Sequence, residues 1–246
     1  MRTTLHQIRS IVAPPLTGPH GPLPPLLLVL TVVTGLVDAF SYLALGRVFV
    51  ANMTGNVVFI AFSLAGAKGF SLLASVLALL AFVAGAVAGG RLYGLAAAHR
   101  ARLLLGATVA QLALVLVSLG LSETVSLPAD GASRAVLVVL LGLAMGSQNA
   151  VVRRLAVPDL TTTVLTMTLT GVAADSRLAG GGDSRAGRRL LSALAMFAGA
   201  LAGAALIVHG HPTAPLPIVA ALLAVVAAGL VPHRHSTLPW AAPEAG

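Results

Sequence analysis

The chain contains no cysteine among its 246 residues. This absence excludes a disulfide framework, a thiolate metal site and a cysteine nucleophile. Charged residues are also scarce, at 9% of the chain, and aromatic residues reach only 4%. A soluble globular domain carries about 25% charged residues. The shortage of charge therefore excludes an ordinary soluble domain and indicates that most of the chain lies in lipid, where charge is costly.

Common catalytic motifs are missing as well. The sequence has no glycine-rich phosphate loop, no HExxH motif and no spacing typical of a catalytic triad. Ser41, Ser63 and Ser147 lie in apolar segments without a histidine that could activate them. We therefore expect that the chain is not an enzyme and binds no cofactor.

Two histidine pairs, His209 with His211 and His233 with His235, are the nearest approach to a metal-binding pattern. One apolar segment separates the pairs, so they are expected on opposite membrane faces and predict no metal site. The formal net charge of +8 would suggest nucleic acid for a soluble protein. Here the arginines occur in short loops, where they set membrane orientation, so we expect no nucleic-acid partner.

Hydrophobic residues make up 57% of the chain, and the mean hydropathy is +0.97. A helix needs about 20 apolar residues to cross a bilayer. Most of the apolar segments meet this length, although the threonine-rich one at 159–174 is short. The segments cover residues 26–45, 49–66, 70–92, 103–121, 134–152, 159–174, 190–208 and 216–231.

The first of two related halves contains an unusually polar stretch. Residues 35–66 are apolar enough for lipid, yet they include Asp38, Asn52, Thr54 and Asn56. Polar groups in the bilayer core are expensive, so such a cluster requires hydrogen-bond partners or a function. Asp38 is the ionisable group that lies well inside a predicted span.

An internal repeat is predicted by three ordered matches. The motif at 35–39 recurs at 146–150, and the small-residue motif at 84–90 recurs at 198–204. Between them, Thr54-Gly-Asn56 matches Thr166-Met-Thr168 weakly. The offsets of 111 to 114 residues stay nearly constant. We expect one repeat over about 26–121 and the other over about 134–231, an arrangement common among transporters.

The distribution of lysine and arginine distinguishes two topologies. If all eight segments span, the two sides carry nine and six of these residues. If 49–66 and 159–174 re-enter on the side that they left, the counts become twelve and three. The second arrangement follows the positive-inside rule better and makes the repeats inverted. The alternative stays open, because 49–66 is long and apolar enough to span.

The fold expected is an all-α polytopic membrane protein with about six spanning helices, two shorter or re-entrant helical segments and an inverted internal repeat. Residues 26–231 form one transmembrane domain. The segments 1–25 and 232–246 are predicted to be disordered tails, because they are polar and rich in proline. The N-terminus is expected in the cytoplasm, on the side with more lysine and arginine.

The spacing of the polar residues predicts a shared depth in the membrane. If the chain folds back near Gly46, Asp38 and Thr54 both lie about 12 Å from the turn. An inverted repeat would then bring two polar groups together near the membrane centre. The alternative is packing, in which such groups merely hydrogen-bond between helices. The candidate pathway residues are Asp38, Asn52, Thr54, Asn56, Gln148, Asn149, Thr163 and Thr166.

Glycines at GxxxG spacing predict close helix packing, through Gly85 and Gly89 in one repeat and Gly199 and Gly203 in the other. Packing within one chain is the first interpretation. A homo-oligomer interface remains the alternative.

A resemblance to a known family rests on two stretches, GLVDAFSYLALGRVFVANMTGNVV at 35–58 and SQNAVVRRLAVPDLTTTVLTMTLTG at 147–171. They resemble the YoaK-like bacterial membrane proteins of unknown function, over about residues 26–230. Met167 stands where the family pattern implies glycine. The resemblance implies about six membrane helices and a location in the bacterial inner membrane, and it indicates no substrate. The matching positions are Gly35, Asp38, Phe49, Asn52, Thr54, Gly55 and Asn56, and then Gln148, Asn149, Arg153, Pro158 and Thr162.

These observations favour a small secondary transporter or channel with a polar site around Asp38 and the motif at 52–56. Its partners would be the lipid bilayer and a small-molecule or ion substrate of unknown identity. The alternative function is a membrane scaffold or interaction protein that transports nothing.

Overall fold

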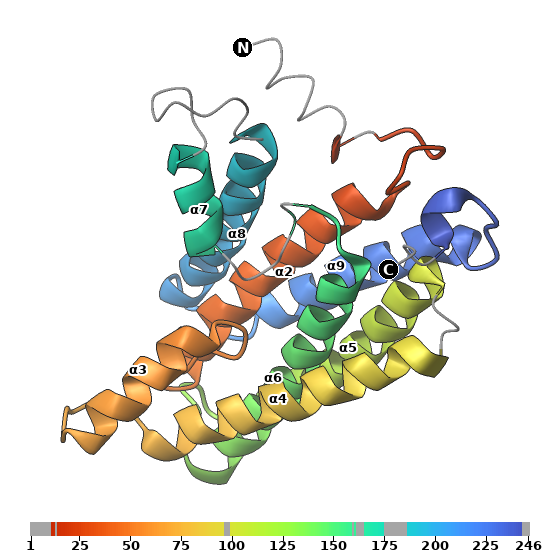
Figure 1. Cartoon of the computed structure of the whole chain (residues 1–246). Helices are drawn as coiled ribbons and strands as arrows, with labels where there is room; N and C mark the ends of the chain where they lie inside the picture. Colours follow the sequence, from red (N-terminus) through yellow and green to blue (C-terminus); the bar gives the residue numbers. More distant parts are fainter. Residues whose placement is uncertain are drawn as a thin grey trace.

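The computed structural model describes residues 11–12, 14–95, 99–158, 160, 165–174 and 186–242. Within these ranges the protein is helical and has no strand. The α-helices follow the predicted apolar segments closely (Figure 1). They are α2 (Leu23–Ala44), α3 (Met53–Leu64), α4 (Leu72–Leu95), α5 (Arg100–Ser122), α6 (Gly131–Leu155), α7 (Leu165–Ala174), α8 (Ala186–Val208) and α9 (Pro215–Leu230).

Six of these helices are long and apolar enough to cross a membrane: α2, α4, α5, α6, α8 and α9. The remaining two are too short, because α3 has 12 residues and α7 has 10, against the roughly 20 that a span needs. The prediction of an all-α protein with six spanning helices and two shorter helical segments is therefore confirmed.

The helices pack in crossed pairs between the two halves of the chain. Helix α4 lies along α6, and α2 lies along α8 (Figure 1). Helix α5 contacts both α6 and α9, and α9 also contacts α2. The two short helices each accompany one span, α3 beside α4 and α7 beside α8. Each half therefore buries its helices against the other half.

Glycine makes the two closest crossings possible. A Cβ on Gly85 would lie 2.2 Å from the carbonyl oxygen of Leu143, and one on Gly199 would lie 2.2 Å from that of Val32. Gly89 and Gly203 lie at the same crossings, against Ser147 and Ala39. Each contact joins α4 to α6 or α2 to α8, so all four predicted glycines pack helices within one chain. The hydrophobic effect does not drive helices together in lipid, so van der Waals contact between closely packed helices supplies the attraction.

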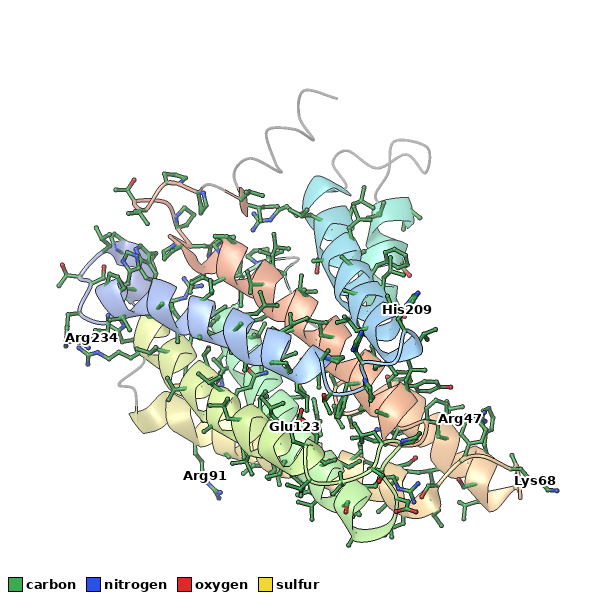
Figure 2. All side chains as sticks on the ribbon, turned by 180° about the vertical axis from the view of Figure 1, so that it is seen from behind. Arg47, Lys68, Arg91, Glu123, His209 and Arg234 are labelled. Atoms are coloured by element: carbon green, nitrogen blue, oxygen red, sulfur yellow. The ribbon has the colours of Figure 1, made fainter. Side chains whose placement is uncertain are left out.

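The hydrogen bonds show which helix ends lie together. The Ala129 amide, just before α6, donates to the Ala44 carbonyl oxygen at the end of α2, at 2.9 Å. At the other end of the bundle, Arg100 contacts the segments before α2 and after α9. We call this second end, which carries residues 14–22 and 231–242, the terminal end. Figure 2 shows Arg234 there, whereas Arg47 and Lys68 lie toward the opposite end.

Parts of the two predicted tails, residues 14–22 and 231–242, belong to the described structure and pack on the helices. Helix α2 begins at Leu23, and residues 231–233 and 239–241 form short 3-10 helices, η2 and η3. Trp240 is only 1% exposed and packs in the core. The physical reason is non-local: Trp240 and the carbonyl groups near it find partners on α5, which a composition-based prediction cannot see.

Candidate functional site

Asp38 lies one and a half turns before the end of α2, and its carboxylate is 4% exposed. One carboxylate oxygen accepts hydrogen bonds from the backbone amides of Val50, at 3.2 Å, and Ala51, at 3.0 Å. The other accepts a hydrogen bond from the Asn52 side-chain amide. These donors all belong to the irregular segment that follows α2. Hydrogen bonds from the protein therefore stabilise the negative charge of Asp38 in place of water.

The Asn56 side chain also holds the segment 45–52, which links α2 to α3. The Asn56 side chain accepts a hydrogen bond from the Phe49 amide at 3.0 Å and donates one to the Phe49 carbonyl oxygen at 2.6 Å. Asn56 is the buried residue of α3. Both asparagines of the motif at 52–56 therefore hold this segment in place, together with Asp38.

The segment 45–52 returns toward the interior before α3 begins. Its start lies at the end of α2, yet Val50 and Ala51 reach Asp38, which precedes that end by six residues. Irregular backbone at membrane depth requires internal hydrogen-bond partners, and Asp38 and Asn56 supply them. Thr54 points away from this arrangement, because it is exposed on α3. Of the three residues predicted at the depth of Asp38, Asn52 contacts it, Asn56 holds Phe49, and Thr54 is exposed.

A second buried polar group joins three helices. Gln111 on α5 donates to the side-chain oxygen of Gln148 on α6 at 2.7 Å, and Gln148 donates to the Thr34 hydroxyl on α2 at 3.2 Å. All three are at most 2% exposed. We call Thr34, Gln148 and Gln111 the polar chain. Since Thr34 and Asp38 are four residues apart on one helix, they share a face.

Sequence reasoning found only part of this group. Gln148 was expected, whereas Gln111 and Thr34 were not. The available signal was that Gln111 is the one amide in the apolar segment 103–121, and a lone amide in lipid needs a partner.

The remaining predicted pathway residues lie in the second half of the chain. Asn149, which the predicted repeat pairs with Asp38, donates to the Met145 carbonyl oxygen of its own helix at 2.8 Å. Thr166 is exposed on α7, and Thr163 lies outside the described residues. Gln148 reaches the first half through Thr34. The meeting of two equivalent polar groups at the membrane centre stays a prediction.

A cluster of aromatic rings packs against the segment 45–52. Phe49 stacks on Tyr42 with ring centroids 5.0 Å apart and on Phe59 at 5.7 Å. Phe59 in turn contacts Phe70 at 5.1 Å, and the Arg47 guanidinium lies 5.9 Å from the centre of the Phe70 ring. Arg47 has a left-handed backbone, with φ of 59°. The rings therefore connect the segment 45–52 to α3 and to Phe70, shortly before α4.

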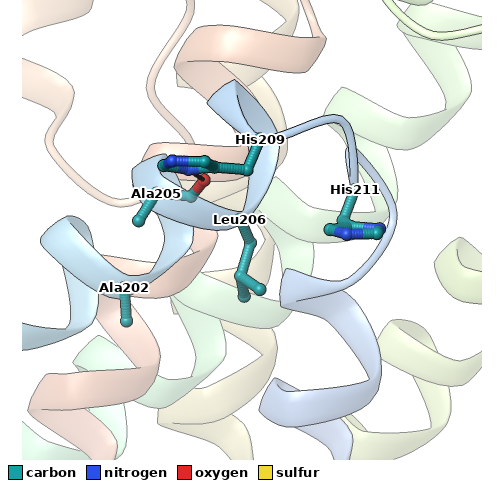
Figure 3. Close-up of a pocket in the computed structure, with 5 residues that line it drawn as sticks. All are labelled: Ala202, Ala205, Leu206, His209 and His211. Atoms are coloured by element: carbon teal, nitrogen blue, oxygen red, sulfur yellow. Dashed lines mark hydrogen bonds between the residues drawn. The ribbon is translucent and has the colours of Figure 1, made fainter.

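A shallow hollow of about 450 Å³ lies at the end of α8, opposite the terminal end. Ala202, Ala205 and Leu206 form its apolar floor, and His209 and His211 lie at its edge (Figure 3). The His209 ring bonds the Ala205 carbonyl oxygen of its own helix at 2.7 Å. Among the described residues, no three histidine, aspartate or glutamate side chains gather as metal ligands.

Comparison with known proteins identifies relatives. Residues 26–229 match the family described as protein of unknown function (DUF1275). The chain is 31% identical over 150 residues to the UPF0700 transmembrane protein YoaK of Bacillus subtilis (strain 168), an alignment that covers 61% of this chain and 65% of that protein. No solved structure matches. The predicted resemblance to YoaK-like proteins is confirmed.

The matched residues include α3 to α8 in full and nearly all of α2 and α9, and they end before η2 and η3. The relative is named a transmembrane protein, which agrees with the six membrane-spanning helices. This chain is a multi-pass membrane protein that belongs to the DUF1275 family of proteins of unknown function.

Proposed function

We propose that the chain is a small secondary transporter or channel whose polar path is closed, opposite the terminal end, by the segment 45–52. The observation that supports this proposal most is the order of polar side chains along one face of α2. Thr34 belongs to the polar chain, Asp38 lies one turn farther, and Val50 and Ala51 cover Asp38. Withdrawal of the segment 45–52 would expose the carboxylate first and the polar chain directly beneath it.

The cost of this arrangement supports the proposal. A mid-membrane carboxylate costs about 3 kcal/mol on insertion scales, and an apolar residue could connect α2 to its neighbours without that cost. Transporters commonly place broken helices and irregular backbone around a polar site, with a short helix beginning there. Helix α3 begins at Met53, directly after Asn52 contacts Asp38.

The helix contacts support an inverted repeat. Under the repeat assignment, α2 corresponds to α6, α4 to α8, and α5 to α9. The contact of α2 with α8 then corresponds to that of α6 with α4, and the contact of α9 with α2 corresponds to that of α5 with α6. The short helices also correspond, since α3 lies beside α4 and α7 beside α8. Alternating access in such proteins moves one repeat against the other.

We further propose that the chain resides in the bacterial inner membrane with the terminal end in the cytoplasm. Single cysteines introduced into this cysteine-free chain provide the test. Cysteines at the exposed positions Lys68 and Asp130 should react with a membrane-impermeant thiol reagent added outside intact cells. Cysteines at the exposed Arg102 and at 176–188 should react only after the cells are opened. Labelling of position 102 from outside would overturn the assigned orientation.

A non-transporting scaffold is the second candidate, and one observation agrees with it as well as with a transporter. Asp38, Gln111 and Gln148 are buried and satisfied by partners within the chain. A closed transporter and a static scaffold share this feature, so solvent access must separate them.

Thr34→Cys reports that access, because Thr34 is fully buried in the polar chain. Val109→Cys is the matched control, since Val109 is an apolar residue at a similar depth on α5 and is 51% exposed on the lipid side. A transporter or channel predicts that an impermeant thiol reagent modifies the cysteine at 34 much faster than the one at 109. Equal, negligible reactivity in a folded protein would favour the scaffold.

A further inference from the structure

Two segments from opposite ends of the sequence cover the terminal end of the bundle. Residues 14–22 lead into α2, and residues 231–242 follow α9. The segments pack on each other, because the buried Trp240 ring lies so close to Gly21 that a Cβ there would approach it to 2.5 Å. We call these two segments the terminal cover. The cover consists of turns and short 3-10 helices, so its position depends on contacts with the spanning helices.

Arg100, at the first turn of α5, makes hydrogen bonds to both segments of the terminal cover. It donates to the carbonyl oxygen of Trp240 at 3.3 Å and to that of Pro19 at 3.4 Å. It also donates to the carbonyl oxygen of Leu155 at the end of α6. The side chain is 5% exposed, and its five N–H donors can hold several carbonyl groups at once. Arg100 therefore connects the cover to α5 and α6.

The contacts of Arg100 resemble those of Asp38 at the other end of the bundle, with the charge reversed. Asp38 is a buried carboxylate that accepts hydrogen bonds from backbone amides of the segment 45–52. Arg100 is a buried guanidinium that donates to backbone carbonyl oxygens of the terminal cover. Hydrogen bonds to charged groups are stronger than those between neutral groups. At each end, one charged side chain on a spanning helix therefore holds non-helical backbone in place.

A further buried polar side chain lies between Arg100 and the polar chain. Thr108 and Gln111 are on the buried face of α5 with Arg100, at about 12 Å and about 16 Å from it along the helix. Thr108 is 1% exposed, and its hydroxyl has no hydrogen-bond partner among the described residues. A buried hydroxyl without a protein partner is a group that water or a polar solute can hydrogen-bond.

We propose that the terminal cover, held by Arg100, is the second closure of the polar path, and that Thr108 lines the path behind it. The path then runs from Asp38 through the polar chain to Thr108, with one closure at each end. This inference rests on the proposed function, because a closure requires a path behind it. Alternating access needs two closures that open at different times, and the segment 45–52 supplies only one.

Thr108→Cys reports access to the path from the terminal end, and it removes no hydrogen bond to a described residue. Val109→Cys is the matched control, because this neighbouring residue is 51% exposed on the lipid side. An impermeant thiol reagent is added to one membrane face at a time, in intact cells or in inside-out vesicles. Arg100→Gln should raise the modification rate at position 108 several-fold from the terminal end only. Asp38→Asn should raise it from the opposite end only, and position 109 should not respond.

Further variants separate the closure from a general effect of charge or strain. Arg153→Gln removes an exposed arginine at the end of α6 and should leave the rate at position 108 unchanged. Gly21→Leu keeps Arg100 but displaces the Trp240 ring, so it should also raise the rate from the terminal end. Gly131→Leu is its control, because Gly131 has a similar φ, 49° against 46°, and nothing lies within 4 Å of a Cβ there.

The proposal is overturned if folded Arg100→Gln and Gly21→Leu proteins keep the unmodified rate from the terminal end. If Arg100→Gln does not fold, the Gly21→Leu result alone decides. An equal increase with Arg153→Gln would also overturn it. If only Asp38→Asn exposes position 108, the terminal closure is wrong and the proposed function stands. If position 108 stays unreactive from both ends in every folded variant, both are wrong.

Discussion

Replacing Asp38 with alanine should lower the free energy of unfolding by about 3 kcal/mol or more. The substitution leaves the amides of Val50 and Ala51 without their acceptor, and each buried donor without a partner costs about 1–3 kcal/mol. The Asn52 side chain also loses its partner. Thermal unfolding of the purified protein in one detergent, followed by circular dichroism, measures the effect.

Asp130→Ala is the matched control, because Asp130 is an exposed carboxylate that makes no side-chain capping bond. It should melt as the unmodified protein does. Asp38→Asn should be intermediate, since an amide oxygen can still accept from the two backbone amides while its nitrogen faces the amide of Asn52. Adding Asn52→Asp should recover part of the loss. Equal melting temperatures for the alanine variants at 38 and 130 would refute the structural role of Asp38.

Replacing Gly85 with leucine should prevent assembly of the bundle or destabilise it severely. A Cβ at this position would lie 2.2 Å from the Leu143 carbonyl oxygen, which is rigid helical backbone. Overpacking typically costs about 1–3 kcal/mol, and here two whole helices must separate. Gly90→Leu on the same helix is the control, because nothing lies within 4 Å of a Cβ there.

The yield of monodisperse protein from detergent extraction and its melting temperature give the readout. We expect the Gly90 variant to behave normally and the Gly85 variant to aggregate or melt far earlier. Similar behaviour of the two variants would show that α4 does not need its close contact with α6. It would also weaken the assignment of the GxxxG glycines to packing within one chain.

The helices were predictable because lipid imposes a simple length requirement. The predicted segment 26–45 became Leu23–Ala44, and 190–208 became Ala186–Val208. Small residues at fixed spacing likewise predicted where α4 and α8 make close contacts. Both properties are local in the sequence, so no knowledge of distant contacts was needed.

The site was predictable only in part, because its partners are set by irregular or distant backbone. The cost of Asp38 in lipid identified the residue, but its partners Val50 and Ala51 carry no polar side chain to reveal them. Gln111 escaped notice since its partner is on another helix. The position of residues 231–242 was missed for the same reason, because the Trp240 carbonyl oxygen bonds Arg100, which is 140 residues away in the sequence.

The reactivity of a cysteine at position 34, compared with and without Asp38→Asn, tests the central claim most directly. The claim is that the segment 45–52, held by Asp38, closes the way to the polar chain. The account predicts faster modification by an impermeant thiol reagent added at the side opposite the terminal end when Asp38 is replaced, and no change at the Val109→Cys control. An unchanged rate at position 34 in a folded Asp38→Asn protein would contradict it.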